Sequence, residues 1–119
     1  MHMPHLVVEY SRNVEDAVSL DTIMDLIYRS AANSGVMDSI DIKVRAIPYV
    51  HFKLADSGNS FIHVTCRLLS GRSEEQKSRL TNMLRQDLIE LLPDVHSISV
   101  EVVDMDPASY KKRLLDIDR

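Results

Sequence analysis

The chain has 119 residues, of which 45% are hydrophobic and 27% charged, and its net charge at pH 7 is −4. These values are typical of one globular domain, and the lack of any basic run argues against nucleic-acid binding. No apolar stretch reaches the roughly 18 residues that a membrane-spanning helix needs, and the first residues lack the pattern of a signal peptide. The single cysteine, Cys66, cannot form an internal disulfide, and we expect a cytoplasmic protein.

The first half of the chain is predicted to fold as strand, helix and strand. Residues 6–10 form a short apolar strand, and a polar loop follows it. Apolar residues then recur at three-and-four spacing in 20–31, which indicates an amphipathic helix with Ser19 as its N-cap. Gly35 is suited to end this helix because glycine adopts positive φ freely. Residues 40–46 alternate between apolar and charged side chains, which predicts a second strand.

The second half repeats this order. Residues 62–68 alternate as a strand, and Ser73–Gln76 has the form of a capping box that starts a helix. Leucines at helical spacing in 80–91 give this helix an apolar stripe, and Pro93 ends it. Residues 98–102 alternate again and predict a fourth strand.

The predicted fold class is therefore α/β (α+β), a βαβ–βαβ repeat with a turn between the halves at 55–59. Each βαβ unit should pair its strands in parallel, giving a four-stranded mixed sheet with both helices on one face. The other face carries Lys43, Arg45, His63 and Arg67, and it must meet either water or another subunit. We therefore expect a homo-oligomer.

We expect a single domain over residues 1–119, in which residues 1–2 are possible cloning or mis-start residues and 105–119 form a C-terminal tail. Within the tail, Pro107 to Leu115 is predicted to form a short helix. Tyr110 and Leu114 would anchor this helix, and a protruding tail of this kind often docks on a neighbouring subunit.

Several classes of site are excluded or disfavoured by the sequence. Three glycines are too few for a dinucleotide-binding or Walker loop, and the five histidines are too scattered for a zinc site. No G-x-S-x-G elbow is present. Cys66 alternates onto the apolar face of its strand, so we interpret it as a core residue and not as a nucleophile.

Pro4 is the leading candidate for chemistry. If Met3 is the initiator, its removal leaves Pro4 with a secondary amine at the chain terminus. An α-amino group titrates near pH ~8, and burial or nearby cations lower that value. Such an amine would be free at neutral pH and would act as a general base. The alternative is a proline that merely starts a strand.

Arg72 lies just after a Ser-Gly turn, at the expected N-terminus of the second helix. The unpaired N–H groups of a helix N-terminus and a guanidinium together favour an anion, and a guanidinium binds a carboxylate through two parallel hydrogen bonds. The alternative is an exposed arginine on a loop.

Lys43 and Arg45 share one face of the second strand. They would form an electropositive pocket for a polyanionic substrate. Alternatively, acids across the sheet such as Glu9 or Glu101 pair with them.

Residues 3–11, Met-Pro-His-Leu-Val-Val-Glu-Tyr-Ser, resemble the start of the 5-carboxymethyl-2-hydroxymuconate isomerase family of the tautomerase superfamily. The strand at 61–65 and the Ser-Gly-Arg-Ser turn at 70–73 are similar to the second half of that family, and 55–56 falls at its central loop. The resemblance runs from Met3 to about Asp104 and is weak beyond Pro107.

This resemblance implies a βαβ–βαβ subunit in a homotrimer, with no metal and no organic cofactor. It implies isomerisation of an unsaturated 2-hydroxy or 2-oxo polycarboxylate in the bacterial breakdown of homoprotocatechuate, a product of 4-hydroxyphenylacetate. The catalytic proline of the family corresponds to Pro4 and the arginine of its Gly-Arg-Ser turn to Arg72. A second family arginine corresponds to Lys43, and a neighbouring basic position to Arg45.

Two departures from the family pattern bear on function. Lys43 replaces an arginine, and lysine lacks the planar fork that grips a carboxylate. Met1-His2 precedes Met3, and a chain that begins at Met1 would hold the Pro4 nitrogen in an amide without basicity. We therefore expect an active form that starts at Met3. The competing hypotheses are a non-catalytic oligomeric binding module for an acidic metabolite and a tautomerase for another 2-oxo acid.

Overall fold

Alternating burial along β1 and β3 shows how the sequence builds the sheet. In a computed structural model that describes residues 4–115, every second side chain is buried from Leu6 to Tyr10 and from Ile62 to Leu68, and the residues between are partly or fully exposed. Met1 to Met3, on which the expected start of the chain depends, lie outside the described residues. The elements are β1 (His5–Ser11), η1 (Arg12–Asp16), α1 (Leu20–Asn33), η2 (Ser39–Asp41), β2 (Lys43–Tyr49), β3 (Phe61–Leu69), α2 (Glu74–Leu91) and β4 (Ser97–Met105).

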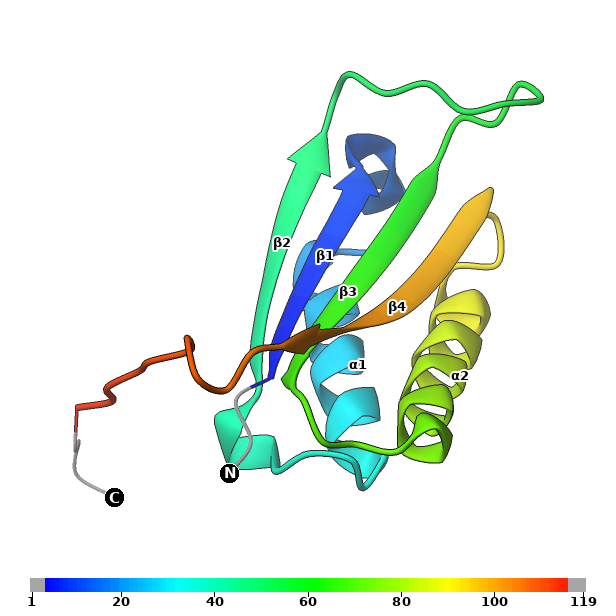
Figure 1. The fold of residues 1–119 in the computed structure, drawn as a ribbon. Coiled ribbons are helices and arrows are strands. Elements are labelled where there is room, and N and C mark those ends of the chain that lie inside the picture. Colours follow the sequence, from blue (N-terminus) through cyan, green and yellow to red (C-terminus); the bar gives the residue numbers. More distant parts are fainter. Residues whose placement is uncertain (1–3, 116–119) are drawn as a thin grey trace.

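The four strands form one mixed sheet in the order β2-β1-β3-β4 (Figure 1). Strand β1 pairs in parallel with β2, and β3 pairs in parallel with β4. The two βαβ halves meet where β1 and β3 run antiparallel. This is the predicted fold, and it places the starts of β1 and β2 at the same end of the sheet as the ends of β3 and β4.

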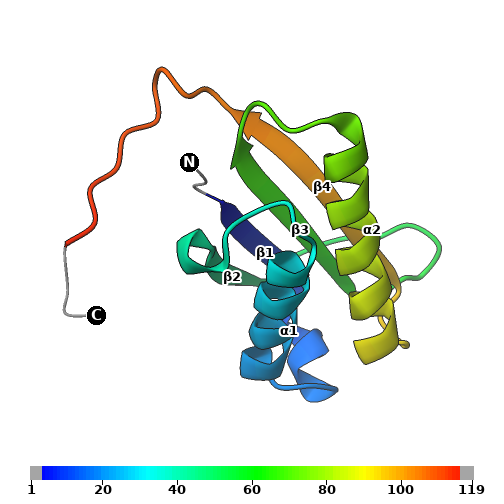
Figure 2. The ribbon, with the colours of Figure 1, turned by 90° about the horizontal axis from the view of Figure 1, so that it is seen from below.

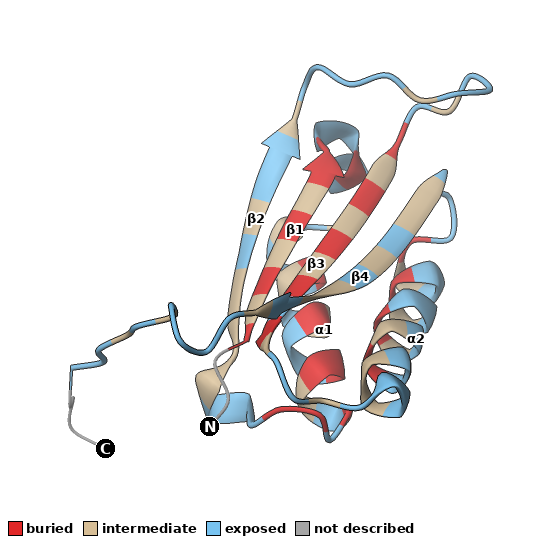
Figure 3. Cartoon of the chain, viewed as in Figure 1, coloured by how far each residue is buried: buried red, intermediate tan, exposed pale blue. Residues whose placement is uncertain are grey.

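Both helices cover the same face of the sheet (Figure 2). The even-numbered side chains of β1 and β3, such as Leu6 and Val64, are fully buried against this layer. The stripe of α2 buries Leu80, Leu84 and Leu88, as the sequence predicts. Figure 3 shows the buried residues gathered on the two inner strands and on the helix sides that face them, which leaves the opposite sheet face open. Neither helix in residues 4–115 is long and apolar enough to cross a membrane.

The predicted helix signals are confirmed. The Ser19 hydroxyl accepts a hydrogen bond from the Thr22 backbone N–H at 3.3 Å. Ser73 and Gln76 form the reciprocal capping box at the start of α2. Gly35 follows α1 with φ of 75°, a left-handed conformation that strains other residues.

The second strand is displaced from its prediction. It runs from Lys43 to Tyr49, while Ser39–Asp41 forms a 3-10 turn, and Ile40 is 66% exposed. Pro48, which the sequence pattern left outside the strand, belongs to it because β2 is an edge strand, where a missing N–H leaves no ladder bond broken.

The predicted tail helix is wrong. Asp106 instead closes a turn, since its backbone carbonyl accepts hydrogen bonds from the N–H groups of Ser109 and Tyr110 at 3.2 and 3.1 Å. The chain from Tyr110 to Leu115 then has no regular structure. A helix of only about two turns costs more entropy to start than its few hydrogen bonds return, so the hydrogen bonds that Asp106 accepts decide the conformation. Leu114, an expected anchor, is 55% exposed.

We predict that the Cys66 thiol is inert in the folded protein. Its side chain is fully buried, and burial raises the pKa of the thiol to about 12, so little reactive thiolate forms. With Ellman's reagent at pH 8, the native protein should release almost no thionitrobenzoate, and the protein in guanidinium chloride should release one equivalent. Rapid stoichiometric release from the native protein would contradict this burial.

Candidate functional site

Pro4 lies at the end of the sheet where β1 and β2 begin. It is buried directly before β1, and its carbonyl accepts a hydrogen bond from the Lys43 backbone N–H at 3.1 Å. This bond continues the parallel β1–β2 ladder, in which His5 lies opposite Lys43. The ladder therefore fixes the proline ring beside the first residue of β2.

Arg45 and His5 form a hydrogen-bonded pair on the open face of the sheet. The Nη1 atom of Arg45 lies 3.0 Å from Nδ1 of His5, and Nε2 of His5 lies 2.8 Å from the Tyr110 hydroxyl. Because a guanidinium can only donate, Nδ1 must accept and the ring proton must lie on Nε2. His5 is therefore neutral in this arrangement, and its Nε2–H donates to Tyr110.

The electrostatic surroundings of His5 agree with that tautomer. Burial lowers its pKa most, and nearby positive charges lower it further. These charges belong to two strands, β2 and β3, and to the tail, which are far apart in sequence: Arg45, Lys43, Arg67 and Lys112. The open face thus carries a cationic cluster around His5, at the same end of the sheet as Pro4.

The acids that might have neutralised Lys43 and Arg45 are engaged elsewhere. Glu9 accepts a hydrogen bond from the Tyr49 hydroxyl, and Glu101 lies 2.7 Å from Nε2 of His63. Lys43 donates instead to the backbone carbonyl of Asp41 at 3.4 Å. Burial lowers the pKa of Lys43, and the charge of Lys112 lowers it further.

Arg72 is held in place by backbone carbonyls and is not an exposed loop arginine. Its Nε donates to Val36 O at 3.2 Å and its Nη1 to Leu69 O at 2.8 Å. The residue is partly buried, and burial lowers its pKa. It directly precedes Ser73, the N-cap of α2, as the sequence predicts.

The predicted site residues thus gather at one end of the sheet in two sets of contacts. Lys43 and Arg45 project from the open face, where they contact Asp41 and His5. Arg72 donates hydrogen bonds to the carbonyls of Val36, just after α1, and Leu69, the last residue of β3. Pro4 is buried like Leu6, and its carbonyl accepts the hydrogen bond from the backbone N–H of Lys43, so it lies at the start of β1 at the same end of the sheet.

Sequence reasoning missed three residues of this region, His5, Tyr110 and Lys112. His5 had a usable signal, because alternation along β1 places it on the face opposite Leu6 and Val8. Tyr110 was expected only as an anchor of a tail helix, whereas it contacts His5. Lys112 had no signal, since the path of an irregular tail leaves no periodicity in the sequence.

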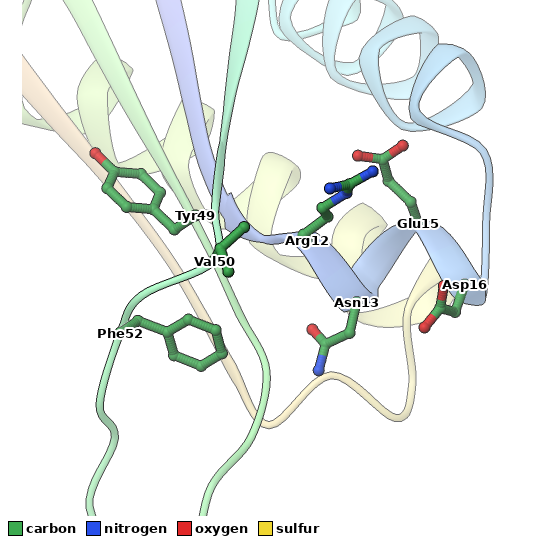
Figure 4. A pocket seen from close by; sticks show the side chains of 7 residues that line it. All are labelled: Arg12, Asn13, Glu15, Asp16, Tyr49, Val50 and Phe52. Carbon is green, nitrogen blue, oxygen red and sulfur yellow. The ribbon is translucent and has the colours of Figure 1, made fainter.

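A separate hollow lies at the opposite end of β1 and β2 and holds none of the predicted residues (Figure 4). Its volume is about 560 Å³. The residues around it are Arg12, Asn13, Glu15, Asp16, Tyr49, Val50 and Phe52. Within residues 4–115, no three His, Cys, Asp or Glu side chains are grouped so as to hold a metal ion.

Comparison with solved structures agrees with this fold. A 5-carboxymethyl-2-hydroxymuconate isomerase from Deinococcus radiodurans R1 superposes with a TM-score of 0.79 at 24% identity, covering 93% of this chain and 89% of that one. A 5-carboxymethyl-2-hydroxymuconate delta-isomerase gives 0.75 at 21% identity, with 96% and 89% covered. A structure described as "W0 fused 4-OT wild type symmetric trimer" gives 0.67 at 14% identity, with 87% and 88% covered.

The chain therefore has the tautomerase-like fold of these structures. The sequence profile of the 5-carboxymethyl-2-hydroxymuconate isomerase family matches residues 4–115. The chain belongs to the 5-carboxymethyl-2-hydroxymuconate isomerase family, and the match includes the tail as far as Leu115. A search of curated proteins gave no match.

We predict that the His5 imidazole titrates below about 6.5, the ordinary value for this group, because burial and the surrounding cations disfavour its protonated form. The measurement is an NMR titration of the ring protons. Arg45→Met removes one cation and should raise the midpoint, whereas Arg12→Met, at the far end of β1, should leave it unchanged. A wild-type midpoint at or above 6.5 would refute the arrangement described for His5.

Proposed function

We propose that this protein is a 5-carboxymethyl-2-hydroxymuconate delta-isomerase that transfers a proton through the amine of Pro4. The observation that carries the proposal is the position of Pro4, buried at the start of β1 and bonded to Lys43, with cations of other segments gathered around the adjacent His5. Family membership supports an unsaturated 2-hydroxy polycarboxylate as the substrate class. We propose, as the sequence resemblance implies, that this substrate arises in homoprotocatechuate breakdown. We expect the reaction to take place in the cytoplasm.

The reaction needs one proton donor and acceptor and no net redox change. The free amine of Pro4 takes the proton of the 2-hydroxyl group, and the O–H electron pair forms the C=O bond. The conjugated double bonds of the substrate shift along its carbon skeleton, and the ammonium of Pro4 returns the proton to the carbon at the far end of the conjugated system. The amine is then regenerated, so the ring nitrogen acts as general base and then as general acid.

The cations would hold the substrate and its developing negative charge. Arg72 would bind one carboxylate, and its fixed guanidinium would need little ordering when substrate enters. Lys43 and Arg45 would hold a second carboxylate or stabilise the dienolate. Such preorganised charge is often the largest contribution to catalysis. Neither role requires a metal or an organic cofactor.

We further propose that three subunits assemble through the open sheet faces. Two helices cover only one face, and the other carries the half-buried or exposed side chains of all four strands. The description of one structural neighbour as a symmetric trimer supports this assembly.

We predict that Pro4→Ala lowers kcat by about 100-fold or more, the usual contribution of a positioned general base. The enzyme for this test is prepared with residue 4 as its first residue, and ketonisation of 5-carboxymethyl-2-hydroxymuconate is followed by absorbance. Circular dichroism verifies that the variant folds. Undiminished turnover by the variant would defeat the proposal.

A matched control is the same protein with Met-His-Met retained, which we expect to be inactive because its Pro4 nitrogen is an amide. Binding of the substrate without turnover, in a chain whose intact mass begins at Pro4, would favour the alternative of a non-catalytic binding module. Faster turnover of a simple 2-oxo acid such as phenylpyruvate would instead indicate a tautomerase of different specificity.

A further inference from the structure

The C-terminal tail passes the end of the sheet where Pro4 lies. It leaves β4 at Met105, turns at Asp106 and crosses beyond the start of β1 (Figure 2). The Tyr110 hydroxyl contacts His5 at 2.8 Å, and the two rings meet edge to face. Two residues later, Lys112 lies beside Asp41, in the 3-10 turn just before β2.

The Lys112 ammonium group is largely buried from solvent and, within residues 4–115, makes no hydrogen bond. The side chain is 14% exposed, and its Nζ is buried. The carboxylate that faces it is Asp41, whose Oδ1 lies 3.8 Å from Nζ, an ion pair too long for a hydrogen bond. The flanking Lys111 is exposed.

Lys43 shares the same surroundings. Its Nζ makes a long contact of 3.4 Å with the backbone carbonyl of Asp41, and its pKa is lowered by burial and by Lys112. The Asp41 carboxylate pairs with Lys112 and also acts on Lys43, whose pKa it raises in part against the other effects. A buried ammonium is stable only when it is paired and hydrogen-bonded. An additional anion between Lys43 and Lys112 would accept hydrogen bonds from both ammonium groups and balance their charge.

We propose that Lys112 is a substrate-binding residue that forms, together with Lys43, a site for one carboxylate of the substrate. The two ammonium groups would take the place of the planar guanidinium that the family resemblance puts at position 43. The tail would then serve specificity, because it adds the charge that distinguishes a dicarboxylate from a monocarboxylate. This inference rests on the proposed function.

The test measures binding and does not depend on turnover. Glutarate, a saturated dicarboxylate that cannot tautomerise, and butyrate, its monocarboxylate counterpart, are titrated into the ¹⁵N-labelled protein and followed by NMR. We expect Lys112→Met to weaken glutarate binding about tenfold, to a value near that of butyrate, since a hydrogen bond between charged groups is lost. Lys112→Arg should retain most of the affinity, and Lys111→Met should retain all of it.

Unchanged glutarate affinity in Lys112→Met would overturn the proposal, as would an equal loss in Lys111→Met. If Lys112→Met perturbs the spectrum throughout the sheet, Lys112→Gln replaces it and the same criteria apply. A third outcome separates the two proposals. If Lys112→Met weakens glutarate binding but the wild-type protein does not isomerise muconates, the proposed reaction is refuted and the carboxylate site remains supported.

Discussion

The hydrogen bond from the Lys43 N–H to the Pro4 carbonyl is the contact on which the candidate site depends. It starts the parallel β1–β2 ladder one residue before β1, and so fixes the proline beside β2. The same register puts His5 opposite Lys43, while the antiparallel ladder puts Arg67 opposite His5 on the other side. A slip of one residue would turn these side chains into the core. Burial of one face of β1 and β3 thus fixes the strand register, and that register sets the positions of the side chains on the open face of the sheet.

This geometry concentrates positive charge in a chain whose net charge is −4. Lys43, Arg45, Arg67 and Lys112 all influence His5, which the contact with Arg45 keeps neutral. Such a cluster opposes folding, because like charges repel and because Lys43 and Lys112 are partly buried. It is suited to a polyanion, whose carboxylates would relieve the repulsion, and to an amine that must lose its proton near neutral pH. In the proposed reaction, the same set of charges would lower stability and favour catalysis.

Much of this fold could be predicted from the sequence, because its signals are local and periodic. Alternation in β1 and β3 and the caps at Ser19 and Ser73 each identify an element without reference to the rest of the chain. The helix predicted from Pro107 to Leu115 does not form. Apolar spacing over two turns is too short to start a helix when Asp106 accepts hydrogen bonds that stabilise a turn instead. The candidate residues Pro4, Lys43, Arg45 and Arg72 were chosen by residue type and resemblance, and their positions became defined only with the strand order. The contact of Lys112 with Asp41 depends on an irregular path, which no local pattern encodes.

The most direct measurement of the central claim is the titration of a single nitrogen. In protein labelled with ¹⁵N-proline and prepared with Pro4 as its first residue, the chemical shift of the ring nitrogen is followed against pH. Because Pro4 is buried and cations surround the adjacent His5, we expect the midpoint to fall below the ordinary value of about 8 for an α-amino group, which leaves the amine free at pH 7. A midpoint at or above that value would mean that the amine is protonated where it must accept a proton, and would contradict its role as a base.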